Sequence, residues 1–237
     1  MRQKTVSTVA LLALTTLTIA PIVAARAGAD EPAPDLPVYS EQIEVFGDRP
    51  VIAPVALGEP VSIVFGVGEL DIEAAEISQL RAELVLECRK VREEQCGRYK
   101  RKLRVEPVRT AEGLEVRMSG LSLRILRRVG VTGRVLVPRW SPLTVDVGIG
   151  EVDIQAGDED LSVRMKIGEI TVRVPEEHVH SVSMRTRIGD AGIVLPDRHL
   201  EGRRRMLIGA RAEWAEGGGD SRVDVKLRIG EARVRLE

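Results

Sequence analysis

Apolar and polar residues alternate along much of the chain, and the alternation is interrupted at regularly spaced glycines. Around Gly168, apolar residues occupy positions one, three and five before the glycine and positions two, four and six after it. Alternation with a period of two predicts a β-strand with one buried face. Because the alternation shifts by one residue at the glycine, we expect the glycine and the acidic residue after it at a corner between two strands.

The corner pattern recurs at six places along the chain. Its glycines are Gly68, Gly150, Gly168, Gly189, Gly209 and Gly230. From Gly150 onward they are separated by 18, 21, 20 and 21 residues. A fixed period near 20 residues is typical of a solenoid, in which each coil is one supersecondary unit and stacked coils share a core. We therefore predict an all-β fold, a single-stranded right-handed β-helix with coils of about 20 residues.

The segment around Gly209 fits this pattern less well than the others. Polar residues occupy positions where apolar ones are expected, at Arg204, Arg211 and Glu213. Small or apolar residues instead suit the opposite face, at Ala210, Ala212 and Trp214. A change of register by one residue would explain the difference, and a chance resemblance is the alternative.

The first 27 residues have the features of a secretory signal peptide. Arg2 and Lys4 precede an apolar or small stretch at 6–23, and Ala25-Arg26-Ala27 matches an A-x-A cleavage site. An uncleaved membrane anchor is the alternative. Removal of residues 1–27 leaves 210 residues and moves the formal charge from −1 to −4. We expect an exported protein, in the periplasm or at the cell surface, with no transmembrane span in the mature chain.

The remainder divides into a short leader and one long domain. Residues 28–60 are rich in proline and are expected to hold a flexible leader and a first strand, with 43–45 and 61–65 as early strands. Residues 61–237 are expected to form the β-solenoid domain, with a charged excursion at about 75–138. Within the excursion we expect strands at 80–88, 99–108 and 114–118 and a charged loop at 89–97. A helix at 76–91 is the competing interpretation.

Cys88 and Cys96 are the only cysteines, and seven residues separate them. In an exported protein such a pair favours a disulfide that closes the charged loop. A redox or metal site is the alternative, although the spacing is not C-x-x-C and no histidine is near.

Basic residues recur at two positions of the repeat. The first set lies four residues before the glycines and comprises Arg164, Arg185, Arg205 and Lys226. The second set lies two residues before them and comprises Lys166, Arg187 and Arg228. Together they predict a basic outer strip that could hold lipid phosphates or acidic glycans. The alternative is that these residues provide solubility and protect the sheet from aggregation.

Acidic residues and histidines supply the candidate metal ligands. The corner acids are Glu69, Glu151, Glu169, Asp190 and Glu231. Stacked carboxylates could bind Ca²⁺, but we favour ion pairs across the corner with Lys166, Arg187 and Arg228. The histidines are His178, His180 and His199, a ligand count that suits zinc. Their spacing matches no zinc motif, and we expect them in solvent-facing loops.

Composition and motifs argue against several classes of function. A mildly acidic chain with 3% aromatic residues is a poor candidate for nucleic-acid binding or for sugar stacking. The sequence contains no G-x-S-x-G, no phosphate-binding loop and no dinucleotide-binding fingerprint. We predict no catalytic residue, no cofactor and no resident metal.

The run from residue 135 to 154 carries a family resemblance. It consists of Val135-Leu136-Val137-Pro138-Arg139, then Leu143-Thr144-Val145, then Gly150-Glu151-Val152-Asp153-Ile154. This run, with the later G-[DE] corners, resembles a bacterial family of exported repeat proteins of the putative-adhesin or toastrack type. The resemblance covers about residues 61–237 and implies a right-handed β-helix of the cell envelope with no agreed catalytic residues.

We therefore expect an exported, non-enzymatic envelope protein that acts as a binding or scaffold surface, with an envelope component or another protein as its partner. One alternative is a β-helix enzyme that acts on polysaccharides, although such enzymes usually have aromatic-lined grooves. A second alternative is a periplasmic protein that handles lipid or lipopolysaccharide.

Overall fold

The computed structural model describes residues 50–88, 92–126, 128–205 and 208–237. The predicted signal peptide, the strand expected at 43–45 and most of the proline-rich leader lie outside the described residues. The strands are β1 (Val51–Pro54), β2 (Val61–Ala75), β3 (Gln79–Glu87), β4 (Arg104–Thr110), β5 (Gly113–Ser119), β6 (Gly130–Pro138), β7 (Leu143–Gln155), β8 (Leu161–Val174), β9 (Val179–Val194), β10 (His199–Glu201), β11 (Arg203–Arg205), β12 (Gly209–Trp214) and β13 (Ser221–Leu236). The helices are α1 (Glu93–Lys102), α2 (Leu123–Leu126) and a 3-10 turn (Glu176–His178).

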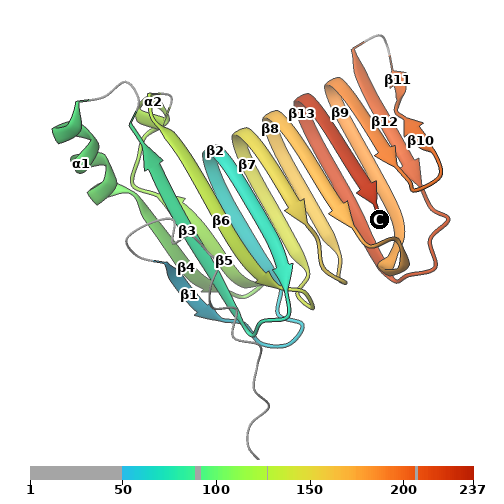
Figure 1. The fold of residues 1–237 in the computed structure, drawn as a ribbon, viewed down its shortest axis with the longest axis horizontal. Helices are drawn as coiled ribbons and strands as arrows, with labels where there is room; N and C mark the ends of the chain where they lie inside the picture. The colour runs from blue at the N-terminus through green and yellow to red at the C-terminus, as the bar shows by residue number, and fades with distance from the viewer. Residues whose placement is uncertain (1–49, 89–91, 127, 206–207) are drawn as a thin grey trace, which may run out of the picture. The chain divides into compact units, whose positions relative to one another are not determined.

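Five long strands, β2, β7, β8, β9 and β13, form the centre of the fold, and each passes through one predicted corner glycine. In β8 the side chains of residues 161, 163 and 165 are buried before Gly168, and those of 170, 172 and 174 are buried after it. We call the part of each strand before the glycine its first arm and the part after it its second arm. The long strands curve along their length (Figure 1), and the buried side chains of both arms contribute to one core rich in Val, Ile and Leu.

The corner glycines lie in register and contact one another through their backbones. Gly150 is aligned with Gly68 and with Gly168, and Gly230 is aligned with Gly168 and with Gly189. Each of these five glycines has a positive φ, for example 140° at Gly168. A Cβ atom on Gly168 would lie 1.7 Å from the carbonyl oxygen of Gly150. Glycine is therefore required here both by the backbone conformation and by the close stacking of the coils.

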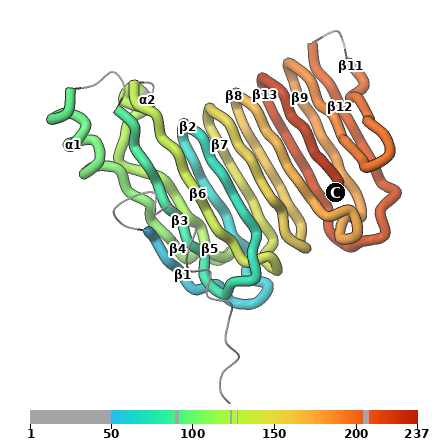
Figure 2. Tube along the Cα trace, in the orientation of Figure 1, coloured from blue at the N-terminus to red at the C-terminus, as the bar shows by residue number. Residues whose placement is uncertain are grey.

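The strands form one mixed sheet whose order differs from the order of the chain. The order is β1-β3-β6-β2-β7-β8-β13-β9-β12-β11, so the C-terminal strand β13 lies between β8 and β9 (Figure 2). It pairs in parallel with both neighbours along both arms. The all-β prediction is confirmed. A single-stranded β-helix is not shown, because Gly230 is stacked between Gly168 and Gly189 rather than after the coils that precede it in sequence.

Antiparallel strands cover both ends of the parallel stack. At one end β3 pairs with β6, β4 with β5 and β1 with β3, while β5 and β6 run parallel to β2. At the other end β10 and β12 both pair with β9 in antiparallel fashion. End strands of this kind interrupt the repeating pattern and limit the addition of further strands.

The segment around Gly209 belongs to this second antiparallel end, so its assignment as a corner is wrong. Gly209 begins β12 and lacks the positive φ of the other five glycines. Ala210, Ala212 and Trp214 are buried, as expected for the opposite face. The physical reason is the reversal of strand direction, which changes the residues that face the core.

The charged excursion contains a helix where none was predicted. The strand at 80–88 is confirmed as β3, which excludes the competing helix at 76–91, and the strand at 114–118 is confirmed as β5. Instead of a loop and the start of a strand, residues 93–102 form α1, and β4 begins only at Arg104. The helix has Glu93 and Glu94 in its first turn and three basic residues in its last, an order that the helix dipole favours.

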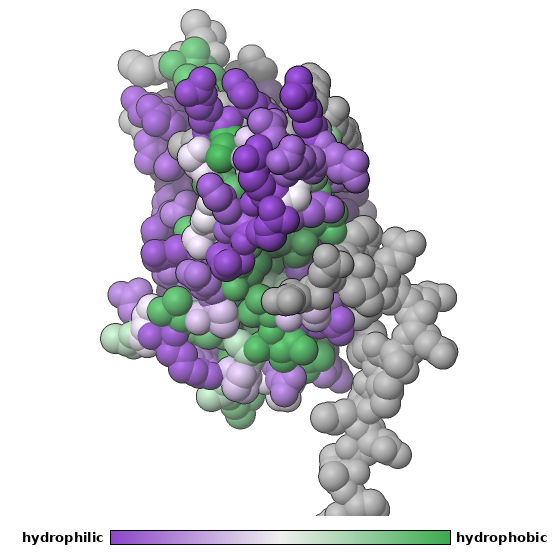
Figure 3. Space-filling model, turned by 90° about the vertical axis from the view of Figure 1, so that its left-hand side faces the viewer, coloured by the Kyte–Doolittle hydropathy of each residue, from purple (hydrophilic) through white to green (hydrophobic). Residues whose placement is uncertain are grey.

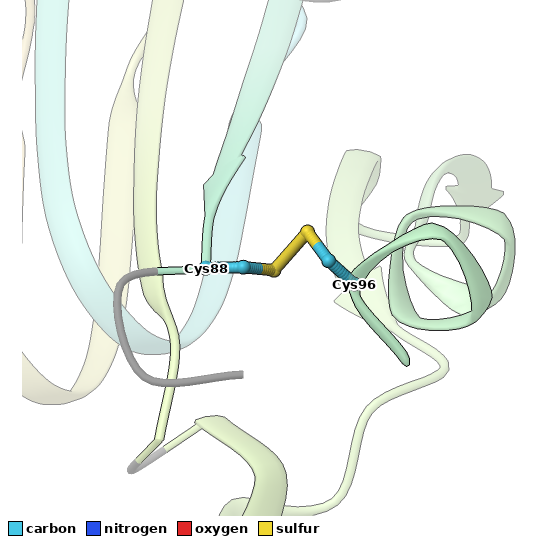
Figure 4. The surroundings of a disulfide bond; sticks show 2 residues. All are labelled: Cys88 and Cys96. Atoms are coloured by element: carbon cyan, nitrogen blue, oxygen red, sulfur yellow. A yellow bond between two sulfur atoms is a disulfide. The ribbon is translucent and has the colours of Figure 1, made fainter. Parts of the chain in front are cut away.

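The predicted disulfide between Cys88 and Cys96 is present and ties the residue after β3 to α1 (Figure 4). No residue of α1 is fully buried, and Tyr99 is its one residue that packs, partly buried, against the core, so the covalent link adds to a limited packing contact. We expect Cys88→Ser with Cys96→Ser to lower the free energy of unfolding by about 2–3 kcal/mol, the loop-closure entropy of a loop this short. Urea unfolding of the oxidised protein and the double variant tests this value. Equal midpoints would show that α1 unfolds independently of the sheet.

Candidate functional site

Six basic side chains lie together on the outer surface of the first arms of β8, β13 and β9. We call this surface the basic face; it comprises Arg164, Lys166, Arg185, Arg187, Lys226 and Arg228, all exposed. Lys226 is aligned with Arg164 on one side and with Arg185 on the other. Neighbouring strands are about 4.8 Å apart, so the cations stand at that spacing across the sheet. The structure places these six residues on one surface, because β13 lies between the other two strands.

Most cations of the basic face have no partner within the described part of the chain. Lys226 forms an ion pair with Asp224 on the same strand. The side chains of the other five form no ion pair or hydrogen bond with any described residue. The predicted pairing of Lys166, Arg187 and Arg228 with the corner acids is therefore wrong. The first arm directs these cations to its outer surface, while the acids begin the second arm on the other side of the glycine.

The basic row continues onto the antiparallel end of the sheet through residues that the repeat pattern did not identify. Arg211 on β12 is aligned with Arg185, and Arg203 on β11 is aligned with Arg211; both are exposed. Arg205 was predicted to continue this row but pairs with Gly209 instead. The sequence did contain a signal for Arg211. Alternate residues of a strand face opposite sides of the sheet, so the expected burial of Ala210 and Ala212 implies that Arg211 between them faces outward.

A shallow hollow of about 430 Å³ lies within the basic face, between β13 and β9. It is lined by Arg185, Arg187, Lys226 and Leu227. Like charges on neighbouring strands repel one another. An anion in the hollow would offset this repulsion and accept charge-assisted hydrogen bonds from the guanidinium groups. The chemistry that the arrangement permits is therefore anion binding.

The outer surface of the second arms has a different character, because it carries both acids and bases and several of them form ion pairs. Arg173 donates to Asp153 at 2.6 Å, Arg134 approaches Glu73 at 3.3 Å, and Arg233 pairs with Glu231. Loss of hydration raises the pKa of Asp71; Arg134 opposes the shift, and the carboxylate of Asp153 adds to it. This surface resembles an ordinary solvated sheet face, in contrast to the basic face.

The candidate metal ligands do not form a metal site within the described residues. The corner acids are in register, with Glu151 aligned with Glu69 and with Glu169. Nowhere in the described ranges are three or more His, Cys, Asp or Glu side chains placed to hold a metal ion. His178 lies in the 3-10 turn with its Nε2 3.3 Å from Asp158. His180 and His199 face solvent as expected, but they lie on β9 and β10, so their assignment to loops is wrong.

Arg139 joins the loops that follow β6, β7 and β2, a role that the sequence did not reveal. Its Nε and Nη2 donate to the two carboxylate oxygens of Asp158, each at 2.9 Å, and its Nη1 donates to Glu76 at 2.9 Å. The bonds to Asp158 raise the pKa of Arg139. Arg139 ends the V-x-V-P-[RK] run noted in the sequence, and its contacts give this arginine a structural role.

No helix within the described ranges is long and apolar enough to cross a membrane. No protein-family model matches the chain, and no curated protein matches it. A crystal structure from Clostridium sporogenes, described as a putative cell adhesion protein, is similar over 80% of this chain and 99% of that chain, with 12% identity and a TM-score of 0.47. At this level of similarity nothing about fold or activity is transferred, so the family resemblance of the repeat pattern stays a prediction.

Proposed function

We propose that the protein is an exported, non-enzymatic component of the cell envelope that binds an anionic partner through the basic face. The observation that carries this proposal is the group of five unpaired cations, in register on three parallel strands. Unpaired like charges on adjacent strands reduce the stability of a sheet. The cost of keeping them together is offset when they contact an anion.

The composition of the basic face indicates the chemistry of the ligand. Four of its six residues are arginine, which binds phosphate, sulfate and carboxylate groups through two parallel hydrogen bonds. No aromatic side chain belongs to this surface, so it offers no platform for stacking bases or sugars. A ligand recognised by its charged groups, such as a phosphorylated or acidic polymer, fits best.

Three features support export and a role in the envelope. The N-terminal 27 residues have the pattern of a signal peptide, Cys88 and Cys96 form a disulfide, and the repeat resembles exported adhesin-type domains. Proteins of this kind present rigid surfaces for binding, and the parallel strands of the basic face provide one.

Charge reversal at the centre of the basic face tests the proposal. We expect Arg185→Glu with Arg187→Glu to reduce the affinity for inorganic polyphosphate by about tenfold or more, because two donors become repulsive charges. Arg98→Glu with Arg101→Glu on α1 makes the same change in net charge on exposed residues and should leave the affinity unchanged. Binding is measured by calorimetry at low and high salt. Equal affinities for both variants, or no binding by the unaltered protein, would refute the proposal.

A further inference from the structure

Exposed isoleucines form an edge directly beside the basic face. The residue one position before each corner glycine is apolar, and strand alternation would place it toward the core. On β8 and β9, however, Ile167 is 42% exposed and Ile188 is 44% exposed. Ile229 on β13 is aligned with both and is half-buried. We call Ile167, Ile229 and Ile188 the isoleucine edge.

The isoleucine edge and the second row of cations occur on the same three strands. The sequence repeats a cation followed by isoleucine: Lys166-Ile167, Arg187-Ile188 and Arg228-Ile229. On β2 and β7 the position of the cation is held by Gly66 and Gly148. There the next residue, Val67 or Ile149, is only half-buried rather than exposed. Two of the three strands that carry the cations, β8 and β9, therefore also expose an apolar side chain, whereas β2 and β7, which lack the cations, do not.

The structure points to an anionic lipid bilayer as the occupant of this combined surface. We propose that the cations of the basic face contact lipid phosphates while the isoleucine edge enters the headgroup layer. This proposal rests on the proposed function, since it uses the same cations. An acidic polymer would need the cations but would leave the isoleucines in water, and an apolar protein partner would leave the cations unpaired. A membrane surface with anionic headgroups satisfies both.

The acids near the isoleucine edge set the boundary of the proposed membrane-binding surface on one side. Glu169, Glu231 and Asp190 follow the corner glycines and begin the second arms. Glu231 is paired with Arg233, and Asp224 is paired with Lys226. Because these acids would be repelled by anionic lipid, the contact is expected on the first arms, from the isoleucine edge across the basic face.

Two exposed apolar residues at the other end of the sheet provide a matched control for the isoleucine edge. Figure 3 shows apolar residues among hydrophilic ones on the end of the molecule that carries β1 and β4. On these strands Ile52 is 55% exposed and Val108 is 46% exposed, close to the values of the isoleucine edge. Replacement of Ile52 and Val108 by serine therefore removes similar exposed apolar surface away from the cations.

Vesicle binding tests the proposal. Sedimentation is measured with phosphatidylcholine vesicles that contain or lack phosphatidylglycerol, and polyphosphate binding is measured in parallel. We expect binding only to the anionic vesicles. Ile167→Ser with Ile188→Ser should weaken it by about tenfold while leaving polyphosphate binding unchanged. Ile52→Ser with Val108→Ser should bind vesicles as the unaltered protein does.

The two measurements separate the inference from the function on which it rests. If polyphosphate binds but anionic vesicles do not, or if the serine variant of the isoleucine edge binds vesicles normally, membrane docking is refuted and anion binding stands. If neither polyphosphate nor vesicles bind, both proposals are refuted. Because the replaced isoleucines are partly exposed, the variants are expected to fold, and their circular dichroism spectra verify this.

Discussion

Gly168→Ala is expected to lower the free energy of unfolding by about 3 kcal/mol or more. Its φ of 140° lies in a region that side chains with a Cβ rarely adopt. The new Cβ would also lie 1.7 Å from the carbonyl oxygen of Gly150, and backbone cannot move aside as a flexible side chain can. Either the coils separate at the corner or the bend changes. Both outcomes disturb the pairing of β8 with β7 and with β13.

Urea unfolding followed by circular dichroism measures this loss. Gly218→Ala is the matched control, because a Cβ there would meet no atom within 4 Å and its φ is not positive. The control is expected to change the stability by less than about 0.5 kcal/mol. If Gly168→Ala were as stable as the control, the close stacking of the glycines would be wrong.

A chain that ends at Gly219, and so lacks β13, is expected to lose the cooperative fold of its C-terminal half. Six apolar side chains of β13 are buried, at residues 223, 225, 227, 232, 234 and 236. At about 1.5 kcal/mol for each of the five Val and Leu side chains and about 0.8 kcal/mol for Ala232, their burial contributes roughly 8 kcal/mol. That amount is comparable to the whole stability of a typical domain, about 5–15 kcal/mol. Removal of β13 also leaves β8 and β9 with unpaired edges, since it is the strand that joins them.

Complementation in trans shows whether the loss is due to β13 itself. The shortened chain is mixed with a peptide of residues 220–237, and the recovery of a cooperative thermal transition is monitored. The matched peptide carries Val225→Asp and Val234→Asp, which place charges at buried positions and should prevent recovery. A shortened chain that unfolds with the midpoint of the full chain would contradict the central position of β13.

The sequence predicted the local structure of each coil well but not the arrangement of the coils. Alternation and the glycine corners identified β2, β7, β8, β9 and β13, because both features depend only on neighbouring residues. The position of β13 could not be predicted, since all the coils carry the same pattern and any two would stack with their glycines aligned. Helix α1 was missed because its many charged residues suit an exposed loop as well as a helix that is largely exposed.

The basic face was predicted from the spacing of its cations, and its limits came from the structure. Arg164, Lys226 and Arg185 share one row because the parallel register holds across three strands. Arg205 fell outside the row because the chain reverses direction before it reaches β12. The exposure of Ile167 and Ile188 differs from what simple alternation predicts, and both residues directly precede a corner glycine with a positive φ.

The central place of β13 also bears on when the protein can fold. β8 and β9 both precede β13 along the chain, and they are joined in the sheet only through it. Until β13 takes its place, β8 and β9 have no strand between them, so this part of the sheet stays open. The topology thereby makes the assembly of the basic face a late event in folding, because its cations come together only when β13 docks.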